Sequence, residues 1–203
     1  MHTSSEPSGP QPEDGGLRSR LVTTGAELVA TEGVQALTLR EIARRAGVSH
    51  GAPRRYFPTH LSLLSAIARQ GFGELSEHLA ASAADSPPDP RAQLHTLARA
   101  YLDFARTRPG MYELMFRHDL LESGHLGLRD TSLPLFSTLV DLIAQVGTRP
   151  AADPAVVAGA LWANLHGIAQ LWGWGSLQLA TGTADVEPLL SAALDAHLGP
   201  AAR

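Results

Sequence analysis

Arginine side chains are concentrated in the segment 39–57, whose sequence is LREIARRAGVSHGAPRRYF. Arg54 and Arg55 are adjacent in this segment, and His50 precedes Arg54 by one helical turn. A guanidinium group can form two parallel hydrogen bonds with a phosphate or with the edge of a guanine base. The segment therefore predicts contact with nucleic acid, although arginines in such a run can also be ordinary solvated charges.

A pair of helices joined by a tight turn would hold these side chains in place. Thr38 begins a capping box (TLRE) that starts the first helix, and Ala43 is small enough for a close crossing of the two helices. Gly47 suits the turn, and we expect Ser49 to cap the second helix and Pro53 to distort its first turn. This pattern predicts a helix-turn-helix, whose second helix presents its polar face to the major groove of DNA.

The distribution of charge supports the same interpretation. Residues 17–70 contain eight arginines and three glutamates, a net charge of +5, whereas the rest of the chain contains eight arginines and seventeen acidic residues. The formal net charge of the whole chain, -4, does not reveal this asymmetry. A basic N-terminal third on an acidic body is typical of a small nucleic-acid-binding module attached to a second part with another role.

Several classes of chemistry are disfavoured by the sequence. Cysteine is absent, and neither a glycine-rich phosphate loop nor a Gly-x-Ser-x-Gly motif occurs. His118, Glu122 and His125 have the spacing of metal ligands on one helical face, but Ser123 and Gly124 favour a frayed helix end there. We therefore expect no enzyme, no catalytic residue, no cofactor and no metal site.

We expect three parts along the chain. Residues 1–16 are rich in Ser, Pro, Gly and acidic residues and predict a disordered tail. Residues 17–70 predict the helix-turn-helix domain, and residues 71–203 predict a helical body. No leader of basic and then apolar residues begins the chain, and no run reaches the ~18 apolar residues of a membrane helix, so we expect a cytoplasmic protein without a membrane partner.

Apolar residues recur at helical spacing beyond residue 16, and no stretch alternates as a strand does, so the predicted fold class is all-α. We expect a first helix from Leu17 that ends before Gly33, and a fourth helix from Thr59 to about Ala84. Further helices are predicted near 90–107, 109–117, 127–147, 153–179 and 185–198.

The arrangement of these residues resembles a known family. Residues 17–70, with the motif LTLREIARRAGVSHGAPRRYFPTHLSLLSAIA, resemble the DNA-binding domain of the tetracycline-repressor (TetR) family of bacterial transcription regulators. Downstream, RPGMYELMF at 108–116 and LWANLHG at 161–167 resemble the WHG-type C-terminal domain of one TetR subgroup. The resemblance implies an all-helical homodimer that binds a DNA operator and a small-molecule ligand, and most members of the family are repressors.

With this resemblance we expect DNA contacts from the helix-turn-helix and from the helices beside it, where flanking arginines would contact the phosphate backbone. The predicted set is Arg18, Arg20, Thr38, Arg44, Arg45, Ser49, His50, Gly51, Arg54, Arg55, Tyr56 and His60. Two positions depart from the family pattern: Arg54 stands where a Tyr is common, and His60 stands where a Lys is common. Arg54 can replace a phosphate contact, whereas His60 is mostly neutral at pH 7. Whether Arg54 or Arg55 reads bases stays open.

The predicted helix 153–179 has two distinct faces. Gly159, Ala163 and Gly167 form a stripe of small residues that lets another helix approach closely. We therefore expect a homodimer formed through helices 153–179 and 185–198, because a two-fold protein matches a palindromic operator.

The other face of that helix carries Trp162 and His166, and aromatic and Met residues recur at helical spacing elsewhere in the body. They could be plain core or could surround a pocket with a few polar anchors. The predicted ligand-binding set is Tyr101, Phe104, Met111, Met115, Trp162, Leu165 and His166. His166 could equally be a buried histidine that is satisfied by a backbone carbonyl. The alternative function is a helical adaptor or small-molecule-binding protein without DNA binding.

Overall fold

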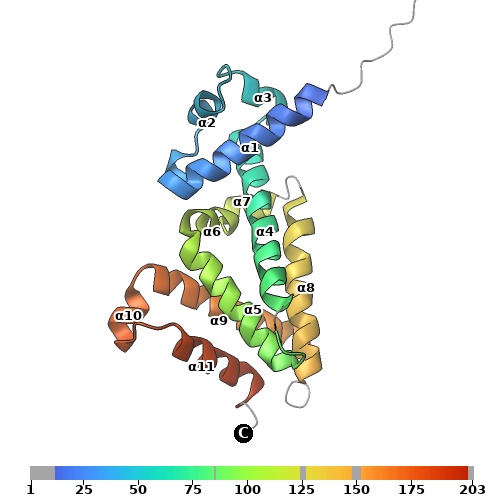
Figure 1. Cartoon of the computed structure of the whole chain (residues 1–203), viewed down its shortest axis with the longest axis vertical. Helices are drawn as coiled ribbons and strands as arrows, with labels where there is room; N and C mark the ends of the chain where they lie inside the picture. Colours follow the sequence, from blue (N-terminus) through green and yellow to red (C-terminus); the bar gives the residue numbers. More distant parts are fainter. Residues whose placement is uncertain (1–11, 85, 124–126, 148–151, 201–203) are drawn as a thin grey trace, which may run out of the picture.

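A computed structural model of the chain describes residues 12–84, 86–123, 127–147 and 152–200. These residues form helices, and none of them lies in a strand, which confirms the predicted all-α class (Figure 1). The elements in chain order are α1 (Pro12–Glu32), the 3-10 turn η1 (Val34–Ala36), α2 (Leu39–Arg45), α3 (Ala52–Tyr56), α4 (His60–Ala84), α5 (Pro90–Thr107), α6 (Pro109–Met115), α7 (His118–Ser123), α8 (Leu128–Val146), α9 (Pro154–Gly173), α10 (Ser176–Thr181) and α11 (Glu187–Leu198).

A small head at one end of the elongated molecule consists of α1, α2, α3 and the start of α4 (Figure 1). Its core is apolar: Leu21 and Leu28 of α1, Ile42 of α2 and Ile67 of α4 are fully buried, and Phe57 closes the end of α3. The i, i+7 spacing of Leu21 and Leu28 places both on one face of α1, as an amphipathic helix requires. Burial of this face fixes α2 and α3 relative to α1.

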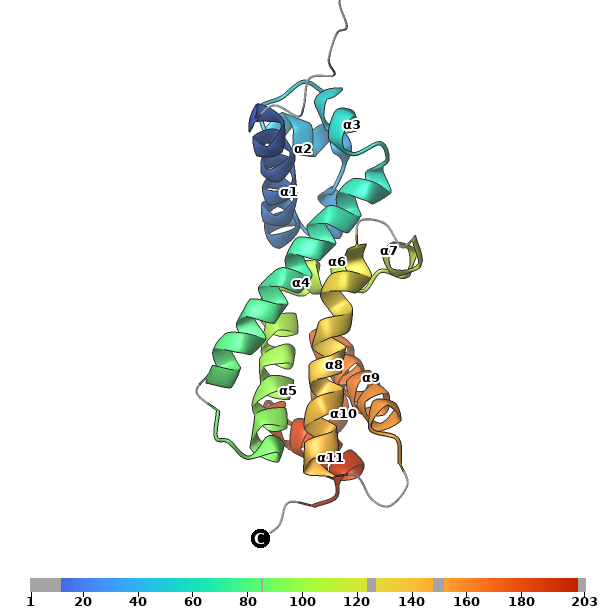
Figure 2. The same cartoon turned by 90° about the vertical axis from the view of Figure 1, so that its right-hand side faces the viewer.

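The 25-residue helix α4 joins the head to the body (Figure 2). Its first half packs against α1, and its second half packs against α5 and α8. Apolar or small buried residues continue along it from Leu63 to Leu75, so the same helix contributes to both parts of the core. A displacement of α4 in the body must therefore reach the head.

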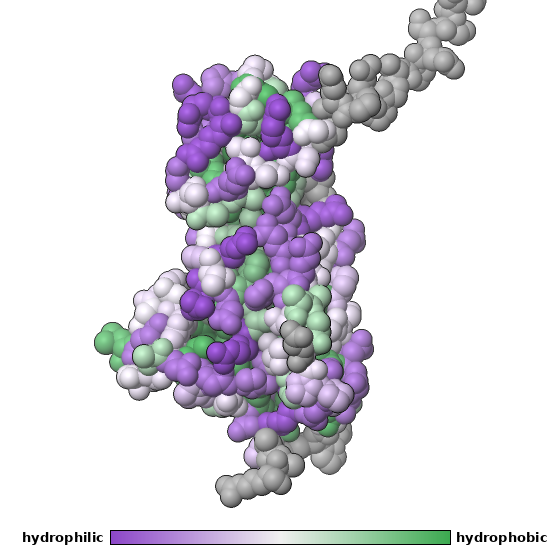
Figure 3. Space-filling view, viewed as in Figure 1, coloured by the Kyte–Doolittle hydropathy of each residue, from purple (hydrophilic) through white to green (hydrophobic). Residues whose placement is uncertain are grey.

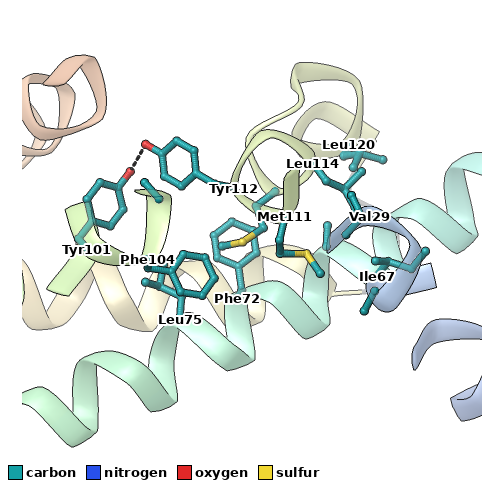
Figure 4. Close-up of a cluster of buried hydrophobic side chains, with 14 of the residues drawn as sticks. Val29, Ile67, Phe72, Leu75, Tyr101, Phe104, Met111, Tyr112, Leu114 and Leu120 are labelled. Carbon is teal, nitrogen blue, oxygen red and sulfur yellow. Dashed lines mark hydrogen bonds between the residues drawn. The ribbon is translucent and has the colours of Figure 1, made fainter. Parts of the chain in front are cut away.

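The short helix α6 is wedged between α4 and α1 at the junction of head and body (Figure 4). Gly71 of α4 makes room for it, because a Cβ atom at Gly71 would lie 2.6 Å from the Sδ atom of Met111 and 2.8 Å from that of Met115. Gly110 of α6 makes a similarly close approach on the other side, since a Cβ atom there would lie 2.6 Å from the carbonyl oxygen of Val29. The two glycines thus set the position of α6.

Three boundaries differ from the sequence predictions. Helix α1 begins at Pro12, so residues 12–16 belong to a helix and not to the predicted disordered tail; a proline in the first turn needs no hydrogen-bond donor there. The predicted helix 153–179 is two helices, because Gly175 adopts the left-handed conformation (φ 74°) and ends α9. The predicted helix 109–117 stops at Met115, and α7 follows as a separate helix.

Candidate functional site

Helices α2 and α3 form a helix-turn-helix. The Oγ1 atom of Thr38 accepts a hydrogen bond of 3.2 Å from the backbone N–H of Glu41, and so caps α2. Ala43 is fully buried on the inner face of α2. Gly47 has a φ of 68°, a conformation that glycine adopts without strain, and the chain turns there toward α3. The predicted cap, the buried small residue and the glycine turn are confirmed.

The start of α3 differs from the prediction. Ser49 does not cap the helix: it lies in the preceding turn, where its carbonyl accepts a hydrogen bond from the N–H of Ala52, and Gly51 is the N-cap residue. Pro53 explains the shift, because proline lacks an N–H and is tolerated only in the first helical turn. A helix that begins at Ala52 has Pro53 in that turn, and α3 is consequently only five residues long.

The outer face of α3 is basic and open. Arg54 and Arg55 are exposed, and no carboxylate in the described ranges forms an ion pair with either. Ser49, His50 and Gly51 are exposed in the turn that leads into the helix. Hydrophilic residues also predominate on the head in the space-filling view (Figure 3). Two guanidinium groups on one short exposed helix can engage phosphates or base edges in a groove of DNA.

The arginines of α2 are engaged within the protein. Arg44 is bidentate on Glu41, with Nε–Oε2 and Nη2–Oε1 distances of 2.9 and 2.6 Å. Arg45 donates from Nε to the same carboxylate at 2.8 Å and from Nη2 to Glu32 of α1. These hydrogen bonds lower the pKa of Glu41 from its ordinary value to about 2. A phosphate that meets Arg44 or Arg45 would share the guanidinium with the carboxylate of Glu41. We therefore expect these two arginines to contribute less to DNA binding than Arg54 and Arg55.

The other predicted DNA contacts are spread around the head. The Arg18 guanidinium lies 5.2 Å from the ring centre of Phe57, a cation–π contact, while Arg20 is exposed two residues further along α1. His60 Nε2 donates a 2.6 Å hydrogen bond to the carbonyl of Leu37, which ties the start of α4 to the loop before α2.

Tyr56 and Arg40 of the head differ in their exposure. Tyr56 is half-buried against the core. Arg40 is also exposed on α2, with no carboxylate paired to it in the described ranges; the sequence analysis counted its charge without naming it as a contact. Its place next to the capping box was the available signal.

A cavity of about 420 Å³ lies in the body between α4, α5, α8 and α9. Its lining is Phe72, Leu75, Ser76, Leu79, Ala80 and Ala83 of α4, Leu94, Leu97, Ala98 and Tyr101 of α5, Phe116 at the end of α6, Ser132, Leu133, Leu135, Phe136, Thr138 and Leu139 of α8, and Leu161, Trp162 and Leu165 of α9. The lining is almost wholly apolar, and none of the described residues in it carries a formal charge. A concave apolar site of this size can hold a small organic molecule.

One end of the cavity has a hydrogen-bonded group of three side chains. The Tyr101 hydroxyl lies 2.9 Å from the Tyr112 hydroxyl (Figure 4) and 3.1 Å from Nδ1 of His166, and the Tyr112 hydroxyl lies 2.7 Å from the same nitrogen. Burial raises the pKa of Tyr101 to about 12, against the opposing effect of hydrogen bonds with Tyr112 and Trp162, and burial lowers the pKa of His166. All three groups are therefore neutral at pH 7.

The structure brings together part of the predicted ligand-binding set. Tyr101, Trp162 and Leu165 line the cavity, and His166 contacts it through Tyr101. Phe104, Met111 and Met115 do not line it: they are buried in the core around α4, α5 and α6, where the close approach of α6 to α4 needs their volume. Of the two alternatives for His166, the Nδ1 atom meets the hydroxyls of Tyr101 and Tyr112 at the cavity and not a backbone carbonyl of the described residues.

Most of the cavity wall was missed by the sequence analysis. Helix α8 contributes residues spaced three and four apart, such as Leu135, Phe136 and Leu139, and α4 contributes Leu75 and Leu79. This spacing marks an apolar helical face, which was the available signal. The pattern alone does not distinguish a face packed on core from a face that borders a cavity.

The faces of α9 and α11 that point away from the body are partly apolar. Gly159 and Gly167 have open space where a Cβ atom would lie, and Ala163 is exposed between them. Beyond α9, the tip at α10 exposes apolar surface (Figure 3), with Trp174 71% exposed and Leu179 89% exposed. The inner faces of both helices pack on each other and on α5. The single chain therefore leaves a smooth helical surface uncovered.

No helix in the described ranges is long and apolar enough to cross a membrane. Likewise, the described residues contain no group of three or more metal-ligating side chains. Of the metal-ligand candidates considered from spacing, His118 begins α7, whereas His125 lies outside the described residues.

About half of the chain is similar to several curated proteins. It is 27% identical over 105 residues to the nucleoid occlusion factor SlmA of Haemophilus influenzae, covering 51% of this chain and 48% of that protein. It is 34% identical over 86 residues to the HTH-type transcriptional regulator BetI of Stenotrophomonas maltophilia, covering 42% of this chain and 44% of that protein. The chain thus spans about half the length of the curated relatives it matches.

Two solved structures show the same fold over most of the chain. A protein of unknown function from Rhodococcus sp. RHA1 has a TM-score of 0.69 and 29% identity, covering 93% of this chain and 97% of that one. The structure of BioQ with its double-stranded DNA operator has a TM-score of 0.61 and 22% identity, covering 89% of this chain and 98% of that one.

Family models match both parts of the chain. Residues 21–67 match the bacterial regulatory proteins of the tetR family, and residues 94–197 match the tetracyclin repressor-like C-terminal domain. The first match covers the helix-turn-helix with its exposed arginines, and the second covers the helices that surround most of the cavity. The chain therefore belongs to the TetR family of DNA-binding transcriptional regulators.

Proposed function

We propose that the protein is a ligand-responsive repressor: a homodimer that binds a palindromic operator and releases it when a small molecule occupies the cavity. The observation that carries this proposal is that the basic surface of α3 and the cavity of the body lie at the two ends of one helix, α4. Arg54 and Arg55, which are exposed and have no ion-pair partner among the described residues, lie just before α4, and the apolar cavity lies against the second half of α4. A protein that acts on a chromosomal operator works in the cytoplasm.

Dimer formation is supported by the surface of α9 and by the shortness of the reading helix. Gly159 and Gly167 leave room for the close approach of a second copy, as the small residues of a helical bundle interface do. A single five-residue helix reads too few bases for a specific operator, so two copies are needed. We expect the two α3 helices to lie about 34–36 Å apart, one turn of DNA.

Release of DNA requires the ligand to prefer a conformation whose two α3 helices no longer fit successive grooves. Helices α4 and α6 are the candidates for this coupling, because both contact α1 of the head and both lie beside the cavity or its polar end. A coupling of ~1–3 kcal/mol lowers operator affinity about 5- to 150-fold, and operator must weaken ligand binding by the same factor.

The test combines selection of bound duplexes from a random pool with sedimentation of the free protein. We expect an inverted-repeat motif and a dimer at micromolar concentration. Gly167→Leu should give a folded monomer with weak operator binding, because a Cβ atom at Gly167 would meet no other element of its own protomer within 4 Å. Ala81→Leu, at an exposed position of α4, is the matched control and should remain dimeric. A selected motif without two-fold symmetry, or a parent protein that sediments as a monomer, overturns the proposal.

A further inference from the structure

We propose that the cavity binds an uncharged, largely apolar molecule that carries one alcohol or ketone oxygen, and that this oxygen docks on the hydroxyl of Tyr101. The inference rests on the proposed function, since it names the ligand class for the same cavity. Three observations carry it: the absence of charge in the lining, the size of the apolar space, and the neutral hydrogen-bonded group at one end.

The lining excludes charged ligands. Among the described residues, no side chain that borders the cavity is acidic or basic, so a carboxylate, phosphate or ammonium group would be buried there without a counter-charge from them. Transfer of an unpaired charge out of water costs far more than the apolar contacts of one small molecule return. The charged groups of carboxylates, phosphorylated metabolites and amines therefore do not fit in the cavity, although the apolar parts of such molecules would.

The apolar space sets the size of the ligand. A volume of 420 Å³ corresponds to about 14 water molecules at ~30 Å³ each, so an occupant of roughly 10 to 20 non-hydrogen atoms would fill it. Aromatic and branched side chains from four helices form its wall, Phe72, Phe136 and Trp162 among them. Such a wall favours an aliphatic chain or a compact ring system.

The polar end can meet either a donor or an acceptor without any charge. His166 Nδ1 can share only one proton with the hydroxyls, and that of Tyr112 is the closer at 2.7 Å. If Nδ1 accepts from Tyr112, then Tyr112 accepts from Tyr101, and the Tyr101 oxygen, which already accepts from the indole N–H of Trp162, has its second lone pair for a ligand alcohol. If Nδ1 carries the proton, the whole chain reverses, and the Tyr101 hydroxyl donates to a ligand ketone.

The hydroxyl of Thr138 at the cavity wall contributes less. Thr138 Oγ1 already donates a 3.1 Å hydrogen bond to the carbonyl of Pro134 one turn back on α8, and Thr138 is exposed. Tyr101, in contrast, is only 8% exposed and is connected to two further buried or half-buried groups. A ligand oxygen thus gains a preorganised partner at Tyr101 and not at Thr138.

The experiment measures binding of four ten-carbon probes to the full chain by calorimetry: 1-decanol, 2-decanone, decanoate and decylamine. We expect the two uncharged probes to bind at least tenfold more tightly than the two charged ones. Tyr101→Phe should weaken decanol and decanone about 2- to 13-fold, the loss expected for one neutral hydrogen bond. Thr138→Val, the matched control, should leave both affinities unchanged.

A second variant keeps the inference testable if Tyr101→Phe does not fold. Leu139→Arg places a cation on the half-buried wall of α8 and should raise decanoate affinity relative to decanol by at least tenfold. Equal affinity of the parent protein for decanoate and decanol overturns the ligand class. Unchanged decanol affinity in a folded Tyr101→Phe variant overturns the assignment of the polar end.

Failure of the proposed function is distinguishable from failure of this inference. The same probes are added to the protein bound to its selected operator duplex. If decanol binds with the expected selectivity and the operator stays bound, release by ligand is wrong while the ligand class stands. If decanoate or decylamine releases the operator and the uncharged probes do not bind, release stands and the ligand class is wrong.

Discussion

Alanine substitutions in α3 and α2 should separate arginines that are free to meet DNA from arginines that are paired within the protein. Arg54 and Arg55 have no carboxylate partner in the described ranges, so alanine at either position removes a positive charge without breaking an ion pair. Each phosphate contact contributes a slope of about 0.9 to log K against log salt, or about 1.8 for the two half-sites of a dimer. An arginine that reads a guanine is instead worth about 1–3 kcal/mol per base contact, with little change in slope.

Arg44 should respond differently because its guanidinium is bidentate on Glu41. Its removal leaves Glu41 paired with Arg45, so less of the charge that meets phosphate is lost. We expect Arg44→Ala to change the salt slope by less than half as much as the Arg54→Ala, Arg55→Ala double variant.

The assay is fluorescence anisotropy of a labelled operator duplex at several salt concentrations between 50 and 200 mM. Over this fourfold range, one phosphate contact per half-site changes the affinity about 12-fold, a difference that the assay resolves readily. The motif selected from random duplexes by each variant then distinguishes a base contact from a phosphate contact. The reasoning is refuted if Arg44→Ala flattens the slope as much as the double variant, or if the double variant alters neither slope nor motif.

Three further predictions follow from the same structure. Gly71→Ala should lower the free energy of unfolding by ~1–3 kcal/mol in urea titrations, because its Cβ atom would lie 2.6 Å from Met111 Sδ; no loss would contradict the packing of α6. Burial lowers the pKa of His166, so the unfolded chain binds this proton more readily, and stability should fall as the pH drops below about 6.5. Urea unfolding at pH 7.5 and 5.5 should show a larger decrease for the parent than for His166→Asn. Glu41→Gln should strengthen operator binding and steepen its salt dependence, since it releases the guanidinium of Arg44 and leaves Arg45 paired with Glu32 alone; weaker binding in a folded variant would count against this.

The elements that depend on local sequence could be predicted. Thr38 accepts a hydrogen bond from the N–H of a residue three positions later, and Gly47 turns the chain on its own conformational freedom, so both features are readable from spacing. The start of α3 was misplaced although its cause is also local. The restriction that Pro53 imposes outweighed the preference of Ser49 for a cap position.

Features that depend on contacts between distant residues could not be predicted. Arg45 pairs with Glu32, thirteen residues away, through the packing of α2 on α1, and this pairing removes it from the set of free cations. The cavity exists because four helices meet without filling the space between Phe72, Phe136 and Trp162. The sequence of each helix reveals only that one of its faces is apolar. The volume left between these faces depends on how all four helices are placed relative to one another.

The close approach at Gly110 limits how hybrid regulators could be built from this protein. The backbone of α6 rests on the carbonyl of Val29, and any side chain at position 110 would push the two apart. If residues 1–70 were replaced by those of another regulator, the last turn of the foreign α1 would lie against α6 of this protein. That α6 fits the last turn of its own α1. The exchangeable part would extend to Met115, so that α1 to α6 stay together with the α4 and α5 walls of the cavity, and only the helices from α7 onward would be replaced.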